Sequence, residues 1–389
     1  MSATVENRTA AGRRRTTGRG RQHERSLKIT KLRSNRIPEV ESLQFAAAFC
    51  GDARRLGLQP ESVDTIITSP PYWRKRDYKV PGQIGQERSP ARYIQSLLIA
   101  LREWRRVLRP TGSVFLNIGD TYHNLNLLDL PSKLAEAARS DGWVIRNRII
   151  WVKNTGMPDP VKNRLASRYE HIIHLTVGRR YYYDLFGYSE KFGNGSNPGD
   201  VWVVEPGVNR SEHLAPFPDE IVERIVTLAC PQEVCVSCGK PRQRVVRRTN
   251  QLNLERPQAR RALEIARKAG LTRQHIAAIQ ATGISDAGKA KLFQTGAMRG
   301  SAEVQRLAAE AKAVLNGYFR EFTFPLRKSV RWSRCGCRKG FMPGVVLDPF
   351  MGTGTTPRVA LRMGRSAVGV DLSPKSVREF RPVVARLFL

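Results

Sequence analysis

The residues with the clearest chemistry form a glycine-containing turn after a short apolar run. The run at 344–347 leads into DPFMGTGTT at 348–356, which predicts a buried strand that breaks into a turn and then opens a helix. Two glycines in this turn allow the backbone to pass close to a bound ligand. A second apolar run, at 367–370, ends on Asp371, and a carboxylate at a strand end can accept both hydroxyls of a ribose. The two segments predict a pocket for a cofactor that contains a nucleoside.

A second motif, TSPPYW at 68–73, lies far earlier in the chain and follows the apolar run at 63–67. Together the two motifs resemble those of the S-adenosylmethionine-dependent amino-methyltransferases that act on DNA bases. The catalytic motif precedes the cofactor motif, which is similar to the permuted beta group of that family. The resemblance covers about residues 45–231 and 344–389, and it includes IWVK at 150–153, YEHIIHLT at 169–176 and HLAPFP at 213–218.

The resemblance implies an α/β fold: a Rossmann-like, seven-stranded, mostly parallel sheet with helices on both faces and with its motifs in circularly permuted order. The residue pattern points to the same class of fold. Helical patterns, such as the one that Ser89 and Pro90 begin, separate strand-like runs at 45–52, 63–67, 113–118, 143–152 and 171–177. Alternating strands and helices are typical of a parallel sheet that is covered on both faces.

The cofactor that the resemblance implies is S-adenosylmethionine. The family's cofactor contacts fall on the glycine turn and on two strand ends, at Asp52, Asp348, Phe350, Gly352, Gly354, Thr355 and Asp371. By resemblance, Asp52 accepts a hydrogen bond from the adenine amine. A simple Gly-Asp turn is the alternative for this residue.

The TSPPYW turn carries the residues expected to act on the methyl acceptor. Methyl transfer to an exocyclic amine requires alignment and removal of water more than covalent catalysis. The resemblance assigns the acceptors of the amine's hydrogen bonds to the Ser69 hydroxyl and the Pro70 carbonyl, in a turn that Pro71 stiffens. Tyr72 then stacks on a base that has been flipped out of its helix. Trp73 either extends this wall or belongs to the core.

Ser69 also indicates which base is methylated. Family members with Asp or Asn at this position more often modify adenine, so Ser69 favours the N4 amine of cytosine. The predicted function is therefore site-specific N4-cytosine methylation of DNA. Methylation of adenine N6 is the nearest alternative, and a catalytically inactive DNA-binding protein or an enzyme that acts on RNA are further ones.

The charge of the chain indicates its partner. The sequence has 66 Lys and Arg against 34 Asp and Glu, a net charge of +32 and a pI near 10.8. Cations that neutralise phosphates release condensed counterions, so this excess favours duplex DNA over a membrane. No apolar run has the length of a membrane span. We expect a soluble, cytoplasmic protein of bacterial or phage origin, with a cognate restriction endonuclease as a candidate partner.

Residues 1–40 are expected to form a basic, disordered arm. Residues 1–36 contain eleven Lys or Arg and two Glu, with too little apolar surface to fold alone. A non-specific DNA tether, a solvated tail and an Arg-rich transit peptide all fit this composition. After the arm, the predicted order is a catalytic half at 41–232, an inserted module at 233–343 and a cofactor half at 344–389.

Four of the six cysteines form two close pairs, which suits a tetrahedral zinc site. The pairs, Cys235 with Cys238 and Cys335 with Cys337, flank the boundary between the two predicted halves. An insertion between the halves of one site explains their separation in sequence. We therefore predict a structural zinc ion, and two unrelated buried or reactive pairs are the alternative.

A helical insert is predicted at about 245–328, where the composition shifts to Arg, Lys, Ala, Gln and Leu. Two helices around a glycine turn, the second capped by Thr272, resemble a helix-turn-helix. Arg273 and Gln274 at the start of the second helix are then candidate DNA contacts, with Lys289 and Lys291 beyond them.

The segment at about 178–205 is the expected target-recognition part. Its candidate DNA contacts are Arg179 and Arg180, which precede three tyrosines. Arginines beside aromatic rings can contact phosphates and stack on bases. A tyrosine edge strand packed on the sheet is the alternative at 181–183.

Overall fold

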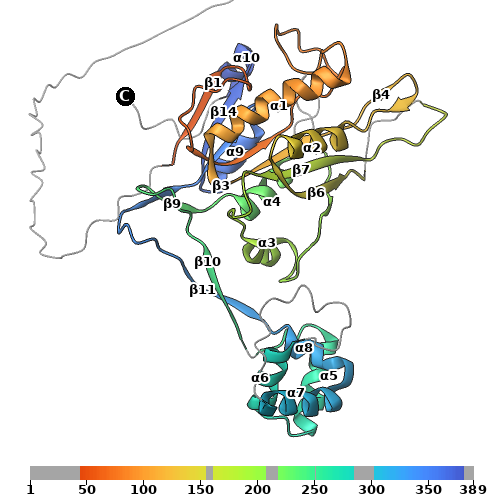
Figure 1. Ribbon diagram of the computed structural model, residues 1–389, viewed down its shortest axis with the longest axis vertical. Coiled ribbons are helices and arrows are strands. Elements are labelled where there is room, and N and C mark those ends of the chain that lie inside the picture. The colour runs from red at the N-terminus through yellow and green to blue at the C-terminus, as the bar shows by residue number, and fades with distance from the viewer. Residues whose placement is uncertain (1–43, 155–160, 207–217, 250, 284–301, 381–389) are drawn as a thin grey trace, which may run out of the picture. The chain divides into compact units, whose positions relative to one another are not determined.

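The computed structural model describes residues 44–154, 161–206, 218–249, 251–283 and 302–380 (Figure 1). The basic arm, residues 213–217 of HLAPFP, and Lys289 and Lys291 lie outside the described residues. None of the helices described is both long and apolar enough to cross a membrane.

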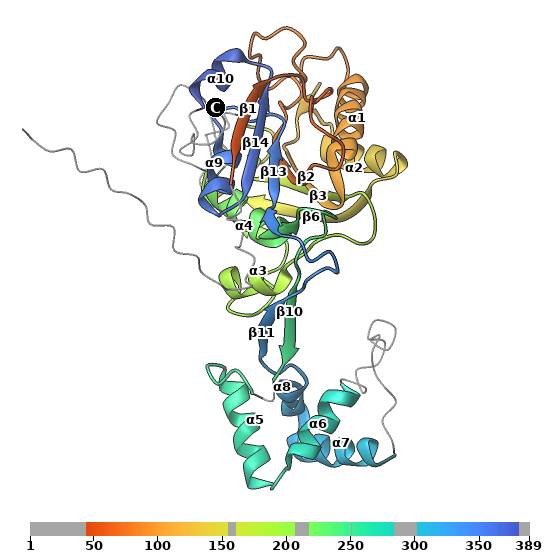
Figure 2. The same ribbon diagram turned by 90° about the vertical axis from the view of Figure 1, so that its left-hand side faces the viewer.

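Eight strands form the main sheet. Their order across the sheet is β1 (Ala46–Cys50), β14 (Ser366–Asp371), β13 (Val345–Asp348), β2 (Val63–Thr68), β3 (Leu108–Ile118), β7 (Tyr169–Thr176), β6 (Val144–Val152) and β8 (Val201–Val203). Neighbours are parallel except that β7 runs antiparallel to β3 and to β6. Figure 2 shows β1, β14, β13 and β2 side by side. The mostly parallel α/β fold is confirmed.

The expectation of seven strands is wrong by one strand. The additional strand is β8, which pairs in parallel with β6 at the edge of the sheet. A run of three residues is too short to show the alternation by which a strand is recognised in a sequence.

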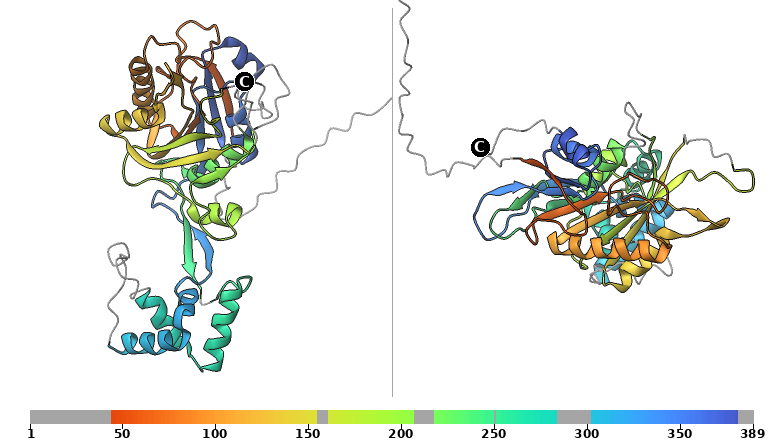
Figure 3. Two further views of the ribbon diagram at one scale, coloured as in Figure 1. Left: turned by 90° about the vertical axis from the view of Figure 1, so that its right-hand side faces the viewer. Right: turned by 90° about the horizontal axis from the view of Figure 1, so that it is seen from above.

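Helices cover both faces of this sheet (Figure 3). α1 (Pro90–Val107) and α2 (Leu130–Ser140) pack in one apolar cluster, and α4 (Asp219–Ala229) and α9 (Thr355–Arg362) pack in the other. Successive residues of a strand point to opposite faces, so Ile66 of β2 joins the first cluster and Ile67 joins the second. β2 is therefore buried on both sides.

The predicted helix after Ser89 is confirmed as α1. The Ser89 side chain accepts a hydrogen bond from the amide of Arg92, and Pro90 stands in the first turn. The helix ends at Val107, and the chain runs directly into β3. Four shorter elements complete this part of the fold: α3 (Leu185–Phe192), α10 (Pro374–Glu379), β4 (Tyr122–His123) and β5 (Asn126–Leu127).

Two short antiparallel pairs lie between α4 and β13 in the sequence. β9 (Glu233–Cys235) pairs with β12 (Phe341–Pro343), and β10 (Arg244–Arg248) pairs with β11 (Arg327–Trp332). The second pair is called the ribbon below. Neither pair was predicted, because their exposed or three-residue strands carry little apolar signal.

Helices occupy the sequence between the two strands of the ribbon. They are α5 (Pro257–Lys268), α6 (Arg273–Thr282), α7 (Ala302–Leu315), the 3₁₀ turn η2 (Asn316–Tyr318) and α8 (Phe319–Thr323). Their apolar side chains form a cluster of their own, which includes Ile279, Leu315 and Phe322. Asn316, at the start of η2, has φ +49° and separates α7 from α8.

Candidate active site

Both predicted motifs lie at one edge of the sheet, where the carboxyl ends of neighbouring parallel strands meet. The Thr68 hydroxyl at the end of β2 donates to the Asp348 carboxylate at the end of β13, at 2.7 Å. On the other side of β13, Cys50 of β1 stands opposite Asp371 of β14. Ligands of open α/β sheets bind at this edge.

The glycine turn leaves space at this edge. Gly352 and Gly354 have φ values of +50° and +79°, which residues other than glycine rarely adopt. Apart from its chain neighbours, no heavy atom of the described residues lies within 4 Å of a Cβ built at Gly352, whereas a Cβ built at Gly354 would lie 2.4 Å from the Phe380 ring. α9 begins directly after Gly354, which has no side chain to cap the first amides of the helix.

Two carboxylates hold the turn in place. Asp371 is half-buried and accepts hydrogen bonds from the amides of Gly352 and Ser373, each at 2.8 Å. Asp348 is 5% exposed and also accepts from the Phe350 amide at 3.0 Å. Burial raises the pKa of Asp348 to about 6, although hydrogen bonds from Thr68 and Thr356 lower it.

Five of the seven predicted cofactor residues divide into two groups by exposure. Asp371, Gly352 and Phe350 retain exposed surface, and Phe350 packs edge-to-face on Trp104 with ring centroids 6.1 Å apart. Asp348 and Thr355 are each 5% exposed, so their side chains offer little surface to a cofactor.

Asp52 forms a local turn. Its carboxylate accepts from the Arg54 amide at 2.9 Å and pairs with the Arg54 guanidinium at 2.6 Å. This geometry is that of the alternative considered from the sequence. Asp52 nevertheless follows β1 at the same edge as Asp371.

The SPPYW turn joins a polar network. The Tyr72 hydroxyl donates to Glu170 at 2.6 Å, accepts from the Asn117 amide at 2.8 Å and lies 3.3 Å from the Ser69 hydroxyl. Glu170 also accepts from Asn117 at 2.6 Å and pairs with Lys153. Burial, followed by the negative charge and hydrogen bond of Glu170, raises the pKa of Tyr72 well above its usual value. Tyr72 therefore remains a hydrogen-bond donor at neutral pH.

Asn117, Lys153 and Glu170 were not named as site residues from the sequence. Their signal was the position of each at or beside a predicted strand end, and Lys153 and Glu170 also lie within the motifs at 150–153 and 169–176. Bringing them together requires the antiparallel direction of β7, which sets Ile118 opposite His171 and so places Glu170 at the catalytic edge.

The prolines and Trp73 have separate environments. The Pro71 carbonyl accepts from the Tyr93 hydroxyl at 3.0 Å, whereas no donor in the described part of the chain reaches the Pro70 carbonyl. Trp73 is 1% exposed, and its indole donates to the Glu87 carbonyl at 2.9 Å. The structure therefore places Trp73 in the core.

Arg179 and Arg180 are exposed, but they lie far from the SPPYW turn. They follow Thr176 of β7, which pairs with Ser113 near the beginning of β3, and the nearby Tyr182 amide donates to the Thr111 carbonyl. This is the sheet edge opposite Ser69. Their role as DNA contacts in a target-recognition segment stays a prediction.

The three tyrosines form no edge strand. Tyr182 is buried, and the rings of Tyr181 and Tyr183 contact the ring of His174.

In the helical insert, Arg273 and Gln274 are exposed at the first turn of α6, which follows the positive-φ turn at Gly270. The helix-turn-helix and its DNA contacts stay predictions.

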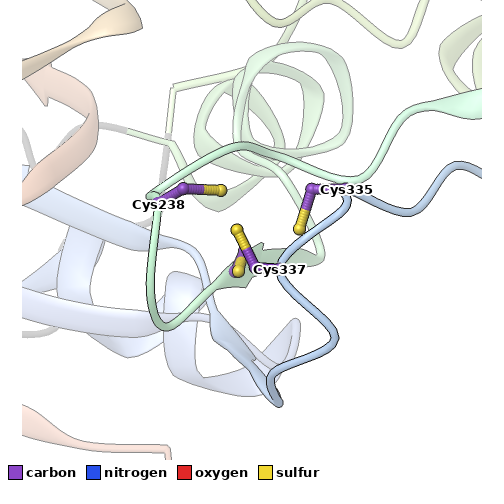
Figure 4. Close-up of side chains that lie close together, drawn as sticks. Cys238, Cys335 and Cys337 are labelled. Carbon is purple, nitrogen blue, oxygen red and sulfur yellow. The ribbon is translucent and has the colours of Figure 1, made fainter.

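The four paired cysteines form one cluster, of which Figure 4 labels Cys238, Cys335 and Cys337. β9 and the turn after it carry Cys235 and Cys238, and the loop before β12 carries Cys335 and Cys337. The four sulfur atoms lie within 4.8 Å of one another, and all four thiols are free. Four converging cysteine ligands match a closed, structural zinc site.

An α/β fold with a glycine turn and an SPPYW turn at one sheet edge resembles that of the DNA amino-methyltransferases. The DNA methylase family model of N6 and N4 methyltransferases matches residues 63–236 and 337–381, and the chain belongs to this family. Residues 237–336, with the ribbon and the helices, lie outside the match.

Curated relatives and a solved structure agree with this family. The chain is 33% identical over 229 residues to the type II methyltransferase M.Cfr9I of Citrobacter freundii, which covers 50% of this chain and 75% of that protein. It is 32% identical over 223 residues to M.SmaI of Serratia marcescens, which covers 48% and 76%. The PvuII DNA methyltransferase (cytosine-N4-specific) shares the fold at a TM-score of 0.50 and 13% identity, over 87% of this chain and 86% of that one.

Replacement of Asp371 tests the cofactor edge. We expect Asp371→Ala to weaken S-adenosylmethionine binding by about 1–3 kcal/mol, the range for a hydrogen bond to a charged group, as measured by titration calorimetry. Asp371→Asn retains one acceptor for the backbone amides and should lose less. Unchanged affinity in a folded Asp371→Ala chain would remove this residue from the pocket.

Proposed function

We propose that this DNA methyltransferase transfers a methyl group from S-adenosylmethionine to the N4 amine of cytosine in duplex DNA. The observation that carries the proposal is the hydrogen bond between Thr68 and Asp348, which sets the SPPYW turn beside the glycine turn. A methyl donor held by one turn and an amine held by the other would then meet at this edge.

The residues of the SPPYW turn prepare the amine. Its nitrogen lone pair is delocalised into the ring, so acceptors that bind the amino hydrogens and pull the nitrogen toward tetrahedral geometry make it more nucleophilic. Ser69 and the unpaired Pro70 carbonyl fill this role, and Tyr72 packs on the flipped base. S-adenosylmethionine supplies an electrophilic methyl group with a good leaving group.

The network around Tyr72 supports this turn. Lys153 holds Glu170, which in turn fixes the Tyr72 hydroxyl and the Asn117 amide. Precise placement is the main requirement of a reaction that needs alignment. We therefore assign Glu170 and Lys153 to positioning the turn, and Asn117 to its wall.

Ser69 supports cytosine as the target base, and adenine N6 is the second candidate because the family includes both activities. The type II relatives support a role in restriction and modification, with a cognate endonuclease as the partner. The direct test is mass spectrometry of nucleosides from duplex DNA treated with the chain and isotope-labelled cofactor. Labelled N4-methylcytosine is expected. Labelled N6-methyladenine would instead identify adenine as the target base. Absence of label from the DNA would overturn the proposal.

The Tyr72 network gives a test of alignment. We expect Tyr72→Phe and Glu170→Gln each to lower the single-turnover methylation rate by about ten- to a hundred-fold, because misplacement near the reacting atoms is costly. Cofactor affinity should be unchanged. The double variant should lose less than the product of the two effects, since both residues act through one hydrogen bond.

A matched control for this cycle is Tyr169→Phe. This change removes a tyrosine hydroxyl one residue from Glu170, on a side chain that is 47% exposed. We expect near-normal rates. Fully multiplicative effects of Tyr72→Phe and Glu170→Gln would show that the two residues act independently and would contradict the positioning role.

We further propose that the cysteine cluster holds one structural zinc ion. Elemental analysis of freshly purified, reduced protein is expected to find one zinc per chain. Cys335→Ser/Cys337→Ser should lose the ion and lower the melting temperature, because metal binding to such a site contributes to folding. Cys50→Ser, at an exposed cysteine outside the cluster, is the control. A wild-type chain without zinc, or a double variant that retains it, would refute the site.

A further inference from the structure

The ribbon of β10 and β11 carries uncompensated positive charge. β10 has three arginines among its five residues and β11 has two arginines and a lysine among its six, with no acidic residue in either strand. Arg247 stands directly opposite Lys328, and like charges in this position destabilise an antiparallel pair. An isolated two-stranded ribbon is already marginally stable. This charge therefore opposes the folding of the ribbon.

An arginine at the base of the ribbon is neutralised. Arg244 pairs with Asp184 at 2.9 Å and lies over the Trp332 ring at 4.5 Å. Farther along, four exposed cations have no ion-pair partner among the residues that the structure describes: Arg247, Arg327, Lys328 and Arg331.

The helices between the two strands have a lower density of positive charge than the ribbon. In their described residues, 251–283 and 302–326, nine Lys or Arg accompany five Glu. Several of these cations are paired, including Arg256 with Glu321, Arg261 with Glu264 and Arg306 with Glu310. Four exposed arginines of the helices, Arg260, Arg267, Arg273 and Arg320, also have no ion-pair partner among the described residues. The ribbon differs in density, because its unpaired cations lie within two strands of five and six residues.

The ribbon is fixed in register at its base. Arg242 pairs with Glu233 at 2.5 Å, and its guanidinium donates to the Ser333 carbonyl at 3.1 Å. Beyond these contacts lie the cysteine cluster and the pairing of β9 with β12. A two-stranded ribbon also has dimensions that the major groove of B-DNA admits. A ribbon of fixed register presents its cations in a constant arrangement, as binding to a polyanion of regular charge spacing requires.

After the ribbon, the chain re-enters the main sheet at the amino end of β13, which lies opposite the catalytic edge. β12 ends at Pro343 and β13 begins at Val345, whereas Ser69 and Asp348 mark the carboxyl ends of their strands. A contact made by the ribbon is therefore distinct from the contact with the target base.

We propose that the ribbon is a second DNA-binding surface, which contacts phosphates of duplex DNA through Arg247, Arg327, Lys328 and Arg331. The choice of DNA as the polyanion rests on the proposed function. Contacts to phosphates carry no sequence information, so this surface adds affinity and salt dependence without choosing the methylated site.

The experiment compares three full-length variants with the wild-type chain in binding to a fluorescent duplex oligonucleotide over a range of salt. For Arg247→Gln/Lys328→Gln we expect the slope of log K against log salt to become shallower by about 0.9 for each phosphate that the ribbon no longer neutralises. Arg261→Gln/Arg306→Gln removes the same formal charge from ion-paired helix positions and should leave the slope unchanged. Arg247→Lys/Lys328→Arg, which keeps the charge, should behave like the wild type.

Three results would overturn the inference. The first is a wild-type slope in the ribbon variant, and the second is an equal reduction of slope in the helix variant. The third is a lower melting temperature of the ribbon variant, because removal of the opposed like charges should leave stability unchanged or raise it. Methylation by the wild-type chain is assayed in parallel: if it fails while the slope changes as expected, the proposed activity falls and the ribbon inference stands.

Discussion

The buried hydrogen bond between Thr68 and Asp348 is the contact on which the active site depends. These residues are 280 positions apart in the sequence, yet their hydrogen bond connects the carboxyl ends of two neighbouring strands. A buried carboxylate without partners is costly, so Asp348 accepts from the Thr68 hydroxyl and the Phe350 amide. One carboxylate thus fixes the register of the SPPYW strand and the start of the glycine turn. A shift of either strand would leave Asp348 unpaired.

A similar joint secures the other end of the same two strands. Asp64 in β2 is 2% exposed, pairs with Arg109 at 2.7 Å and accepts from the Val345 amide of β13 at 2.8 Å. β2 is therefore tied to β13 by a carboxylate at each end. Since β13 follows the insert in sequence, these two joints let distant segments of the chain form one site.

The sequence was sufficient for features that depend on local pattern. Apolar runs located β2, β13 and β14, and the paired cysteines indicated a cluster that the fold assembles. Features that depend on strand direction were not accessible. Because β7 is antiparallel, Glu170 lies at the catalytic edge, whereas Arg179 and Arg180 lie at the opposite one. The ribbon was missed because cationic, exposed strands lack the apolar alternation that marks a half-buried strand.

The position of the insert explains how the chain carries it without disturbing catalysis. The segment outside the family match, 237–336, leaves and re-enters near the amino end of β13, so no catalytic strand end is displaced. Loop closure costs only slightly more as an insertion lengthens. Pairing of β9 with β12 and convergence of the four cysteines hold the two ends of the insert together. Contacts at the base of the insert therefore offset the entropic cost of closing this long connection. The two carboxylate joints of β2 and β13 then hold the active site in register.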